Sequence, residues 1–239
     1  MSKNVIVFYF NDGKGRAELT RLVLVYGQIP FSDQRLSFSE YLSMRDGGKL
    51  PFQQLPVLMV DDQIIGQSCA MARYAAKLAD LYPSNDIEAG LSDMVVDAWR
   101  DLLDLFYGCY VDRVTKEGKF VMTMRSDQEK VEKLDEFFKV ILPSHFDTFE
   151  QIISNNKSSS SLITDSITWA DLAVFDLLDT LDPYASHWTD DSVSFYIKEP
   201  FGPYEPPKDI FKNYPKLEAL KTIISQTPQI AAWLSSHPS

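Results

Sequence analysis

Hydrophobic positions in the first third of the chain switch between strand-like and helix-like spacing. The apolar, β-branched and aromatic run Val5–Phe10 is short enough for a buried strand, and a glycine-containing turn follows it. Apolar side chains then recur at i, i+3, i+4 and i+7 from Leu19, which predicts a helix that ends at Gly27. A second strand is predicted at Pro30–Leu36, whereas Ser39–Gly48 is irregular, with one or two helical turns at most.

The next segment has the pattern of a β-hairpin followed by a helix. Pro56–Val60 and Gln63–Ile65 are short apolar runs separated by two acidic residues, a spacing typical of two strands joined by a two-residue turn. Apolar positions at helical spacing from Met71 to Leu78 predict the helix. The order β-α-β, then β-β-α, predicts a small α/β sandwich.

The rest of the chain has the pattern of a helical domain. Thr168 and Asp171 form a capping box at the start of one predicted helix, with Asp171 at the position where Glu or Gln is most common. Residues 182–215 are rich in proline and aromatic residues and predict a long irregular excursion. Helices are predicted at Leu91–Phe106, at Val131–Phe149, from Thr168 onward, at Leu217–Ser225 and at Ile230–Leu234.

Charge divides the chain at the same place as the hydrophobic pattern. Residues 1–83 carry 9 basic and 8 acidic side chains, whereas residues 84–239 carry 14 and 26. The break falls at Tyr82–Asp86, which has the composition of a helix stop and a short polar linker. We therefore expect two domains, 1–83 and 84–239.

Composition narrows the classes of function. The net charge of −11 disfavours nucleic-acid and membrane binding, because phosphate groups and anionic lipids would be repelled. The first residues lack the apolar core of a secretory signal, and Cys69 and Cys109 form neither a disulfide framework nor a C-x-x-C pair, so a cytoplasmic location is expected. The three histidines are scattered, so we expect no metal site.

Three positions carry candidate chemistry, and each also has a structural interpretation. Tyr9 lies late in a strand before a glycine-containing loop, where α/β folds present functional groups, but taken alone it is more typical of a core residue. Pro56 marks a strand start or a cis turn. Ser68 is a natural N-cap, and the same helix start could bind a carboxylate through its N–H groups.

The order of these motifs is more specific than any one of them. A strand ending in Tyr-Phe is followed by Gly-Arg-Ala-Glu (15–18), Leu-Pro-Phe-Gln-Gln-Leu-Pro-Val-Leu (50–58) and Gln-Ser (67–68). Thr-Trp-Ala-Asp (168–171) and Tyr-Pro-Lys-Leu (214–217) come later. This series resembles the cytosolic glutathione S-transferase family, most closely its sigma class, over nearly the whole chain. The resemblance implies a thioredoxin-like α/β N-terminal domain, an all-α helical C-terminal domain and a homodimer.

The resemblance also implies roles around the sulfur of glutathione. Tyr9 would donate its hydroxyl hydrogen bond to that sulfur, and Arg16 would lie beside it. Leu55, before a cis Pro56, would pair its backbone with the cysteinyl part of the tripeptide. Glutathione would be the co-substrate, and no cofactor is implied.

Further positions would bind the two ends of glutathione. Gln67 and Ser68 would hold the γ-glutamyl carboxylate, while Tyr41, Arg45 and Gln54 would line the glycine end. Asp104 or its neighbour Asp101 would reach the γ-glutamyl ammonium group across the dimer, and a solvated helix face is an equally good interpretation of Asp104. Phe10 and Tyr110 would line the pocket for an apolar electrophile.

Three features depart from the family pattern. The loop from Tyr9 to Arg16 is one residue longer than usual. Gln54 replaces a charged side chain with an amide, which weakens the hold on a carboxylate. The excursion at 182–215 is longer than the family norm.

Three functions fit these residues. The leading hypothesis is a transferase that ionises the glutathione thiol and adds it to apolar electrophiles, as in detoxification. A glutathione-dependent isomerase of the prostaglandin type would use the same thiolate. A non-catalytic ligand-binding or structural member is the third possibility, and the combined presence of Tyr9, Leu55-Pro56 and Gln67-Ser68 argues against it, since a structural role does not need that set.

Overall fold

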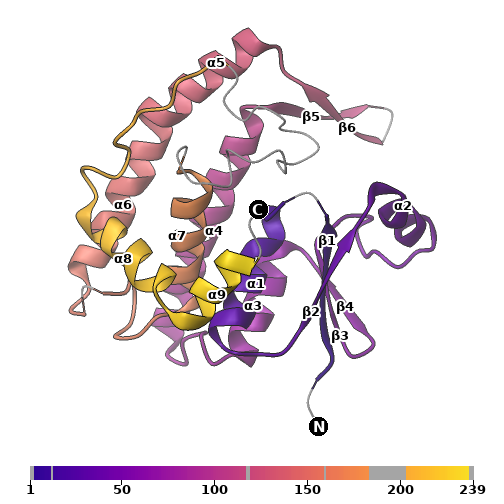
Figure 1. Ribbon diagram of the computed structural model, residues 1–239, viewed down its shortest axis with the longest axis horizontal. Coiled ribbons are helices and arrows are strands. Elements are labelled where there is room, and N and C mark those ends of the chain that lie inside the picture. Colours follow the sequence, from indigo (N-terminus) through magenta and orange to yellow (C-terminus); the bar gives the residue numbers. More distant parts are fainter. Residues whose placement is uncertain (1–2, 12, 117–118, 159, 183–202, 237–239) are drawn as a thin grey trace.

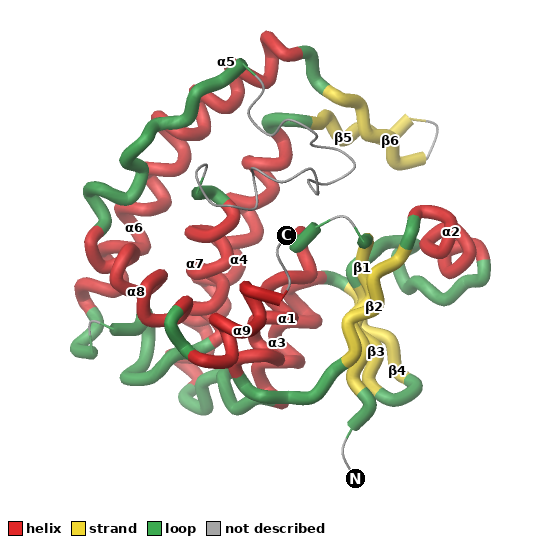
Figure 2. The backbone as a smooth tube through the Cα atoms, viewed as in Figure 1, coloured by secondary structure: helices red, strands yellow, loops and turns green. Residues whose placement is uncertain are grey.

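The computed structural model describes residues 3–11, 13–116, 119–158, 160–182 and 203–236, with the backbone but not the side chains of the strand residues at 113–122. A four-stranded sheet with adjoining helices forms one part, and a larger group of helices forms the other (Figures 1 and 2). This arrangement confirms the predicted fold class. No described helix is long and apolar enough to cross a membrane.

The sheet has the strand order β2-β1-β3-β4, with β1 parallel to β2 and antiparallel to β3. Its strands are β1 (Val5–Phe10), β2 (Ser32–Leu36), β3 (Val57–Val60) and β4 (Gln63–Gly66). Val5 and Val7 are buried on the face of β1 that packs against helices, and Tyr9 continues that face because strand side chains alternate. The β3–β4 hairpin has its predicted two-residue turn.

Three helices and one short turn accompany the sheet. They are a 3₁₀ turn (Gly15–Ala17), α1 (Glu18–Tyr26), α2 (Phe38–Asp46) and α3 (Ser68–Leu78). α2 is more regular than the irregular segment with one or two helical turns that the sequence predicts, since it is helical over nine residues. Ser37 and Glu40 form a capping box at its start, with the Ser37 N–H donating to Glu40 Oε2 at 2.8 Å. α2 has no buried residue, so its sequence lacks the apolar period on which the prediction relied.

The second part begins with a long helix after the predicted linker. Asn85 caps α4 by accepting hydrogen bonds from the backbone N–H groups of Ile87 and Glu88. α7 lies at the centre of this part, packs against α4, α8 and α1, and is buried from Trp169 to Leu178. The helices are α4 (Asp86–Gly108), α5 (Asp127–Glu136), α6 (Leu142–Asn155), α7 (Trp169–Thr180), α8 (Pro215–Ser225) and α9 (Pro228–Ser236).

The helix predicted at Val131–Phe149 is interrupted by a π-helical turn at Phe137–Ile141 between α5 and α6. In that turn the Leu142 N–H donates to the Phe137 carbonyl, five residues earlier. Pro143 follows directly and has no N–H to donate to the carbonyl four residues before it. The wider turn therefore lies where the α-helical ladder would lose a bond.

A β-hairpin, which the sequence analysis did not predict, leaves the otherwise helical part between α4 and α5. It consists of β5 (Val111–Lys116) and β6 (Lys119–Met124). Arg125 fastens its base, because the guanidinium donates to the Gly108 carbonyl at 2.8 Å and pairs with Asp112. Of the predicted excursion at 182–215, residues 183–202 lie outside the described residues, and residues 203–214 form loops and turns.

A buried carboxyl group lies where α7 meets α1 and α4. The Trp99 Nε1–H donates to Asp176 Oδ2 at 2.9 Å, and Asp176 is 2% exposed. Burial raises the pKa of Asp176 to about 8, with the nearby Glu18 carboxylate acting in the same direction. At neutral pH the folded protein therefore keeps a proton that the unfolded chain releases.

This proton predicts a pH-dependent stability. Between about pH 4 and pH 8, the folded state binds more protons than the unfolded state, so the free energy of unfolding falls by up to about 1.4 kcal/mol per pH unit as pH rises. Asp176→Asn keeps an acceptor for Trp99 but cannot ionise. We expect the variant to lose this component of the slope between pH 6 and pH 7 in urea unfolding. Parallel curves for the two proteins would contradict the buried proton.

Candidate active site

Tyr9 lies half-buried at the end of the central strand β1. Its ring packs edge-on against Phe10 with 5.5 Å between ring centres, and the Arg21 guanidinium carbon lies 5.8 Å from the ring centre. Gly15 is so close to the Tyr9 hydroxyl group that a Cβ added there would lie 2.5 Å from the hydroxyl oxygen. Only a glycine can occupy this position without displacing Tyr9, and its φ of +48° also favours glycine.

The residue after this glycine is Arg16, and the loop thus brings Arg16 to the same end of β1 as Tyr9. The Arg16 guanidinium pairs with Asp104 of α4 and lies 5.7 Å from the centre of the Tyr107 ring. The predicted catalytic pair of Tyr9 and Arg16 is therefore joined through Gly15, and the helical part contributes Asp104 and Tyr107 to its surroundings.

Asp104 has a partner within its own chain, which the sequence analysis did not anticipate. Its carboxylate is 44% exposed and pairs with Arg16, while Asp101 pairs with the neighbouring Arg100. The interaction of Asp104 or Asp101 with glutathione in a second subunit stays a prediction.

Tyr41 and Arg45 lie on α2, close to the end of β1. The Tyr41 ring packs edge-on against Phe10 at 5.3 Å, and its hydroxyl group donates to the Gln53 carbonyl at 3.0 Å. The Arg45 guanidinium lies 5.8 Å from the Tyr41 ring centre and pairs with Asp46. Gln54, next to Gln53, is exposed. These contacts place Tyr41 and Arg45 together, at the side of the sheet where Phe10 ends β1.

The structure contains the cis proline and the helix start that the resemblance implies for the site. The Leu55–Pro56 peptide bond is cis, and the buried Pro56 immediately precedes β3. Gln67 has a φ of +69° and occupies the N-cap position of α3, without a side-chain cap. Ser68 is the first residue of the helix, so the prediction that Ser68 is the N-cap was wrong by one position. The first turn of α3 contains no acidic residue, which leaves its positive dipole end available to an anion.

The two residues expected to line an electrophile pocket lie in different surroundings. Phe10 is half-buried between Tyr9 and Tyr41. Tyr110 is only 1% exposed and packs edge-on against Phe106 in the core of the helical part. Its hydroxyl group has no hydrogen-bond partner among the described residues, and burial raises its pKa well above 10. The structure therefore places Tyr110 in the core, and its role as a pocket residue stays a prediction.

The protein's own thiols are poorly suited to act as nucleophiles. Burial raises the pKa of Cys109 to about 12, and burial also raises the pKa of Cys69 above its usual value. Among the described residues, no cluster of histidine, cysteine and carboxylate side chains could hold a metal ion.

The sequence analysis included Gly15 in a motif but did not predict its contact with the Tyr9 hydroxyl group, and it did not name Arg21, which lies near the Tyr9 ring. Gly13 and Gly15 both have positive φ, and the Gly-Lys-Gly spacing in the sequence was the available signal. Arg21 is fully buried, which no pattern of single residues would suggest.

A family model described as the C-terminal domain of glutathione S-transferase matches residues 114–237. S-crystallin 4 of Enteroctopus dofleini is 29% identical over 96% of this chain and 94% of its own length. The hematopoietic prostaglandin D synthase of Gallus gallus is 28% identical over 98% of this chain and 97% of its own. The crystal structure of monomeric Na-GST-3, a glutathione S-transferase of Necator americanus, superposes with a TM-score of 0.72 at 25% identity, covering 99% of this chain and 98% of that one.

Proposed function

Because the chain belongs to the glutathione S-transferase family, we propose that it is a glutathione transferase, an enzyme that ionises the thiol of bound glutathione and adds the thiolate to small apolar electrophiles. One observation carries the proposal: Tyr9, at the end of β1, has its hydroxyl group against Gly15, and Arg16 follows in the same loop. Glutathione is the co-substrate, and the proposal includes no cofactor and no metal.

The chemistry requires the thiol to lose its proton near neutral pH. A free thiol with a pKa of about 8.5 is only slightly ionised at pH 7, and lowering that pKa by about two units requires roughly 2.7 kcal/mol of preferential thiolate stabilisation. A hydroxyl donor and a nearby guanidinium can supply this, because hydrogen bonds to charged groups contribute about 1.5–3 kcal/mol each. Tyr9 and Arg16 are the candidates for these two groups.

The binding residues follow from the same proposal. The backbone of Leu55, before cis Pro56, would pair with the cysteinyl part, and the start of α3 at Gln67 and Ser68 would bind the γ-glutamyl carboxylate. Their arrangement supports this, since both flank the β3–β4 hairpin and α3 begins with an acid-free turn. The remaining assignments are Tyr41, Arg45 and Gln54 at the glycine end, Asp104 or Asp101 in a neighbouring subunit, and Phe10 and Tyr110 toward the electrophile.

A second candidate function is isomerisation. The relative from Gallus gallus is named a prostaglandin D synthase and matches almost the whole chain. A glutathione-dependent isomerase needs the same ionised thiol, so the arrangement of Tyr9, Gly15 and Arg16 serves both activities. The S-crystallin relative keeps open a third possibility, a member without catalysis.

A conjugation assay separates these functions. Purified protein is mixed with glutathione and a chlorodinitrobenzene-type electrophile, and retention on glutathione resin is measured in parallel. We expect retention and turnover for a transferase. Retention without conjugation would favour an isomerase or a binding protein, which a prostaglandin-type endoperoxide substrate then distinguishes. The absence of both retention and turnover would contradict the proposed function.

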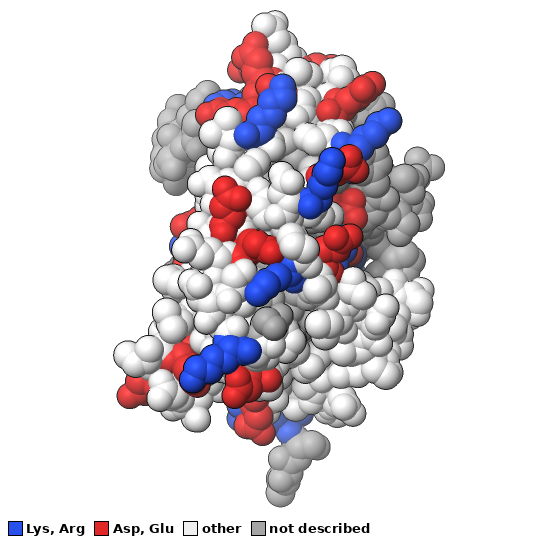
Figure 3. All heavy atoms as spheres, turned by 90° about the vertical axis from the view of Figure 1, so that its left-hand side faces the viewer, with Lys and Arg blue, Asp and Glu red and all other residues white. Residues whose placement is uncertain are grey.

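We also propose that the protein works as a cytoplasmic homodimer of two-domain subunits, divided at 1–83 and 84–239. An apolar stripe on α4 supports the dimer: the exposed fractions are 74% for Ile87, 40% for Leu91 and 49% for Met94. These three side chains lie on one face of the helix, and a contiguous exposed apolar patch typically marks a protein interface. Nucleic acid is not a proposed partner, because acidic and basic side chains are interspersed over the face in Figure 3 and the net charge is −11.

The apolar stripe predicts the effect of one substitution on assembly. The wild-type protein should sediment with about twice the subunit mass of 27.2 kDa. Met94→Lys would place a charge in the interface, so we expect a shift toward the single-subunit mass. Val140→Lys is the control, since Val140 is 63% exposed on a different helical segment and should leave the mass unchanged. A wild-type mass of 27.2 kDa across a wide concentration range would contradict the dimer.

A further inference from the structure

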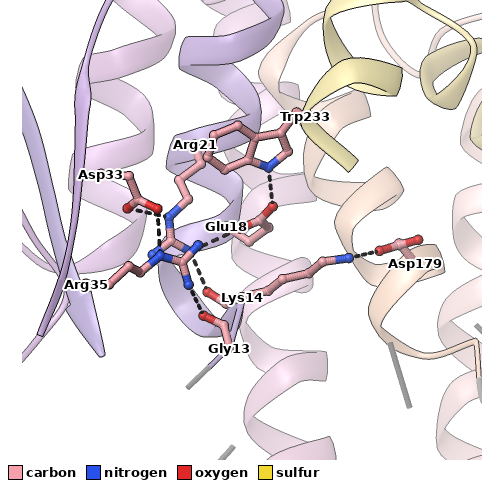
Figure 4. A network of polar contacts seen from close by, with 8 residues as sticks. All are labelled: Gly13, Lys14, Glu18, Arg21, Asp33, Arg35, Asp179 and Trp233. Carbon is pink, nitrogen blue, oxygen red and sulfur yellow. Dashed lines mark hydrogen bonds and ion pairs between the residues drawn. The ribbon is translucent and has the colours of Figure 1, made fainter. Parts of the chain in front are cut away.

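The segment Gly13–Arg16, which follows Tyr9 in the chain, is held by side chains from three directions (Figure 4). The Arg35 guanidinium donates to the Gly13 carbonyl at 2.8 Å, and the Arg21 guanidinium donates to the Lys14 carbonyl at 2.9 Å. The Lys14 ammonium group pairs with Asp179 of α7 at 2.7 Å. This loop, one residue longer than the family pattern, thus has anchors in both parts of the molecule.

The two arginines share one carboxylate. Asp33 on β2 accepts from Arg21 Nε at 2.9 Å and from Arg35 Nε at 2.6 Å. Asp33 is mostly buried, and the Arg21 side chain is fully buried. Each arginine therefore uses one edge of its guanidinium group to bind Asp33 and another nitrogen to bind a carbonyl of the segment. The guanidinium group is suited to this double role, because its donors lie on three separate nitrogens in one plane, whereas the three donors of an ammonium group share a single nitrogen.

The sheet aligns this arrangement with Tyr9. In the parallel pairing of β1 and β2, Tyr9 lies opposite Arg35, and Val7 lies opposite Asp33. Arg35 is thus the neighbour of Tyr9 on the adjacent strand. It also binds Gly13, and Gly15 of the same segment lies against the Tyr9 hydroxyl group.

We propose that Arg35 is a positioning residue for the candidate active site: with Arg21 and Asp33 it holds the Gly13–Arg16 segment, so that Gly15 stays against the Tyr9 hydroxyl group and Arg16 stays beside it. Arg35 acts through the segment and touches no substrate. The proposal rests on the function proposed above, since Tyr9 and Arg16 are the groups being positioned.

The variants Arg35→Met and Arg35→Lys test this role, with Lys221→Met as a matched control. Arg35 is 28% exposed, and Lys221 on α8, in an ion pair with Asp182, is 23% exposed. Each methionine variant removes one cation from a half-buried pair. Lysine at position 35 keeps the charge but replaces the two separate nitrogens that bind Asp33 and Gly13 with one, so we expect it to hold them less well.

Two measurements are made on each protein. The first is amide hydrogen exchange of the peptide that contains the segment, in protein without glutathione. The second is ultraviolet titration of the bound glutathione thiol, with turnover and KM at neutral pH. For Arg35→Met we expect faster exchange in the segment, a thiol pKa higher by about one unit, turnover lower by roughly tenfold and little change in KM. Arg35→Lys should have an intermediate effect, and Lys221→Met should resemble the wild type.

The outcomes separate the inference from the function on which it rests. Unchanged hydrogen exchange of the segment in Arg35→Met would overturn the proposed role of Arg35. Faster exchange with an unchanged thiol titration would also overturn it, because Arg35 would then be only structural. Full rescue by Arg35→Lys would show an effect of charge and would also overturn it. If the wild type binds no thiolate, the proposed function fails, and the exchange measurement still decides whether Arg35 holds the segment.

Discussion

Tyr9→Phe should lower turnover at neutral pH by about ten- to a hundredfold while leaving the fold and glutathione binding nearly intact. Phenylalanine keeps the ring that packs against Phe10 and removes only the hydroxyl group near Gly15. If that hydroxyl group stabilises the thiolate, its loss raises the thiol pKa by one to two units toward the free value, and the ionised fraction falls accordingly.

Ultraviolet titration of the bound thiolate in both proteins checks this result, together with the pH dependence of the rate. The variant should regain much of its rate at higher pH, where the thiol ionises without assistance. Coincident titration curves and equal rates would remove Tyr9 from the mechanism. Arg16 would then be the group to examine.

The second large effect is expected for stability. Asp171→Ala should lower the free energy of unfolding by about 3–5 kcal/mol, because the Asp171 carboxylate closes the capping box of α7 and also binds the preceding loop. It accepts hydrogen bonds from the backbone N–H of Leu162 at 2.6 Å, and from the N–H and hydroxyl groups of Thr168 at 2.7 and 2.8 Å. Asp171 is fully buried, so in the alanine variant these donors would have neither an acceptor nor access to water.

Urea unfolding of wild type, Asp171→Ala and Asp171→Asn measures this effect. Asparagine keeps one acceptor oxygen, so its loss of stability should be intermediate. Glutathione affinity of the folded variants, measured well below their unfolding midpoints, should change little. The reverse result, with stability retained and affinity lost, would assign the capping box to the binding site.

The sequence predicted those elements whose apolar residues repeat toward a core. β1, α1 and α7 agree with their predicted positions, because burial on one face imposes a period that survives in a single sequence. α2 has no buried residue, and only one or two helical turns were predicted there, although Ser37 and Glu40 encode its start locally. The β5–β6 hairpin was missed because the pattern of the surrounding chain is helical.

For the candidate site, too, some residues could be proposed from the sequence and others could not. Tyr9, Pro56 and Gln67 were proposed as site residues from the order of short motifs, and the cis bond at Pro56 agrees with that resemblance. The anchoring of the loop could not be predicted, because Asp33 joins Arg21 and Arg35 only after β2 has paired with β1. Such contacts depend on the register between strands, and no spacing within the sequence contains that information.

The last helix of the chain completes the surroundings of the first. Trp233 on α9 donates its Nε1–H to Glu18 Oε1 at 2.9 Å and packs against Phe31, while Gln229 donates to the Tyr26 carbonyl. During synthesis the N-terminal part leaves the ribosome long before Trp233 is made. Until α9 has been synthesised, Glu18 of α1 therefore lacks its hydrogen bond with Trp233. Without α9 the first helix would lack these contacts, so α1 reaches its final surroundings only when α9 has packed against it.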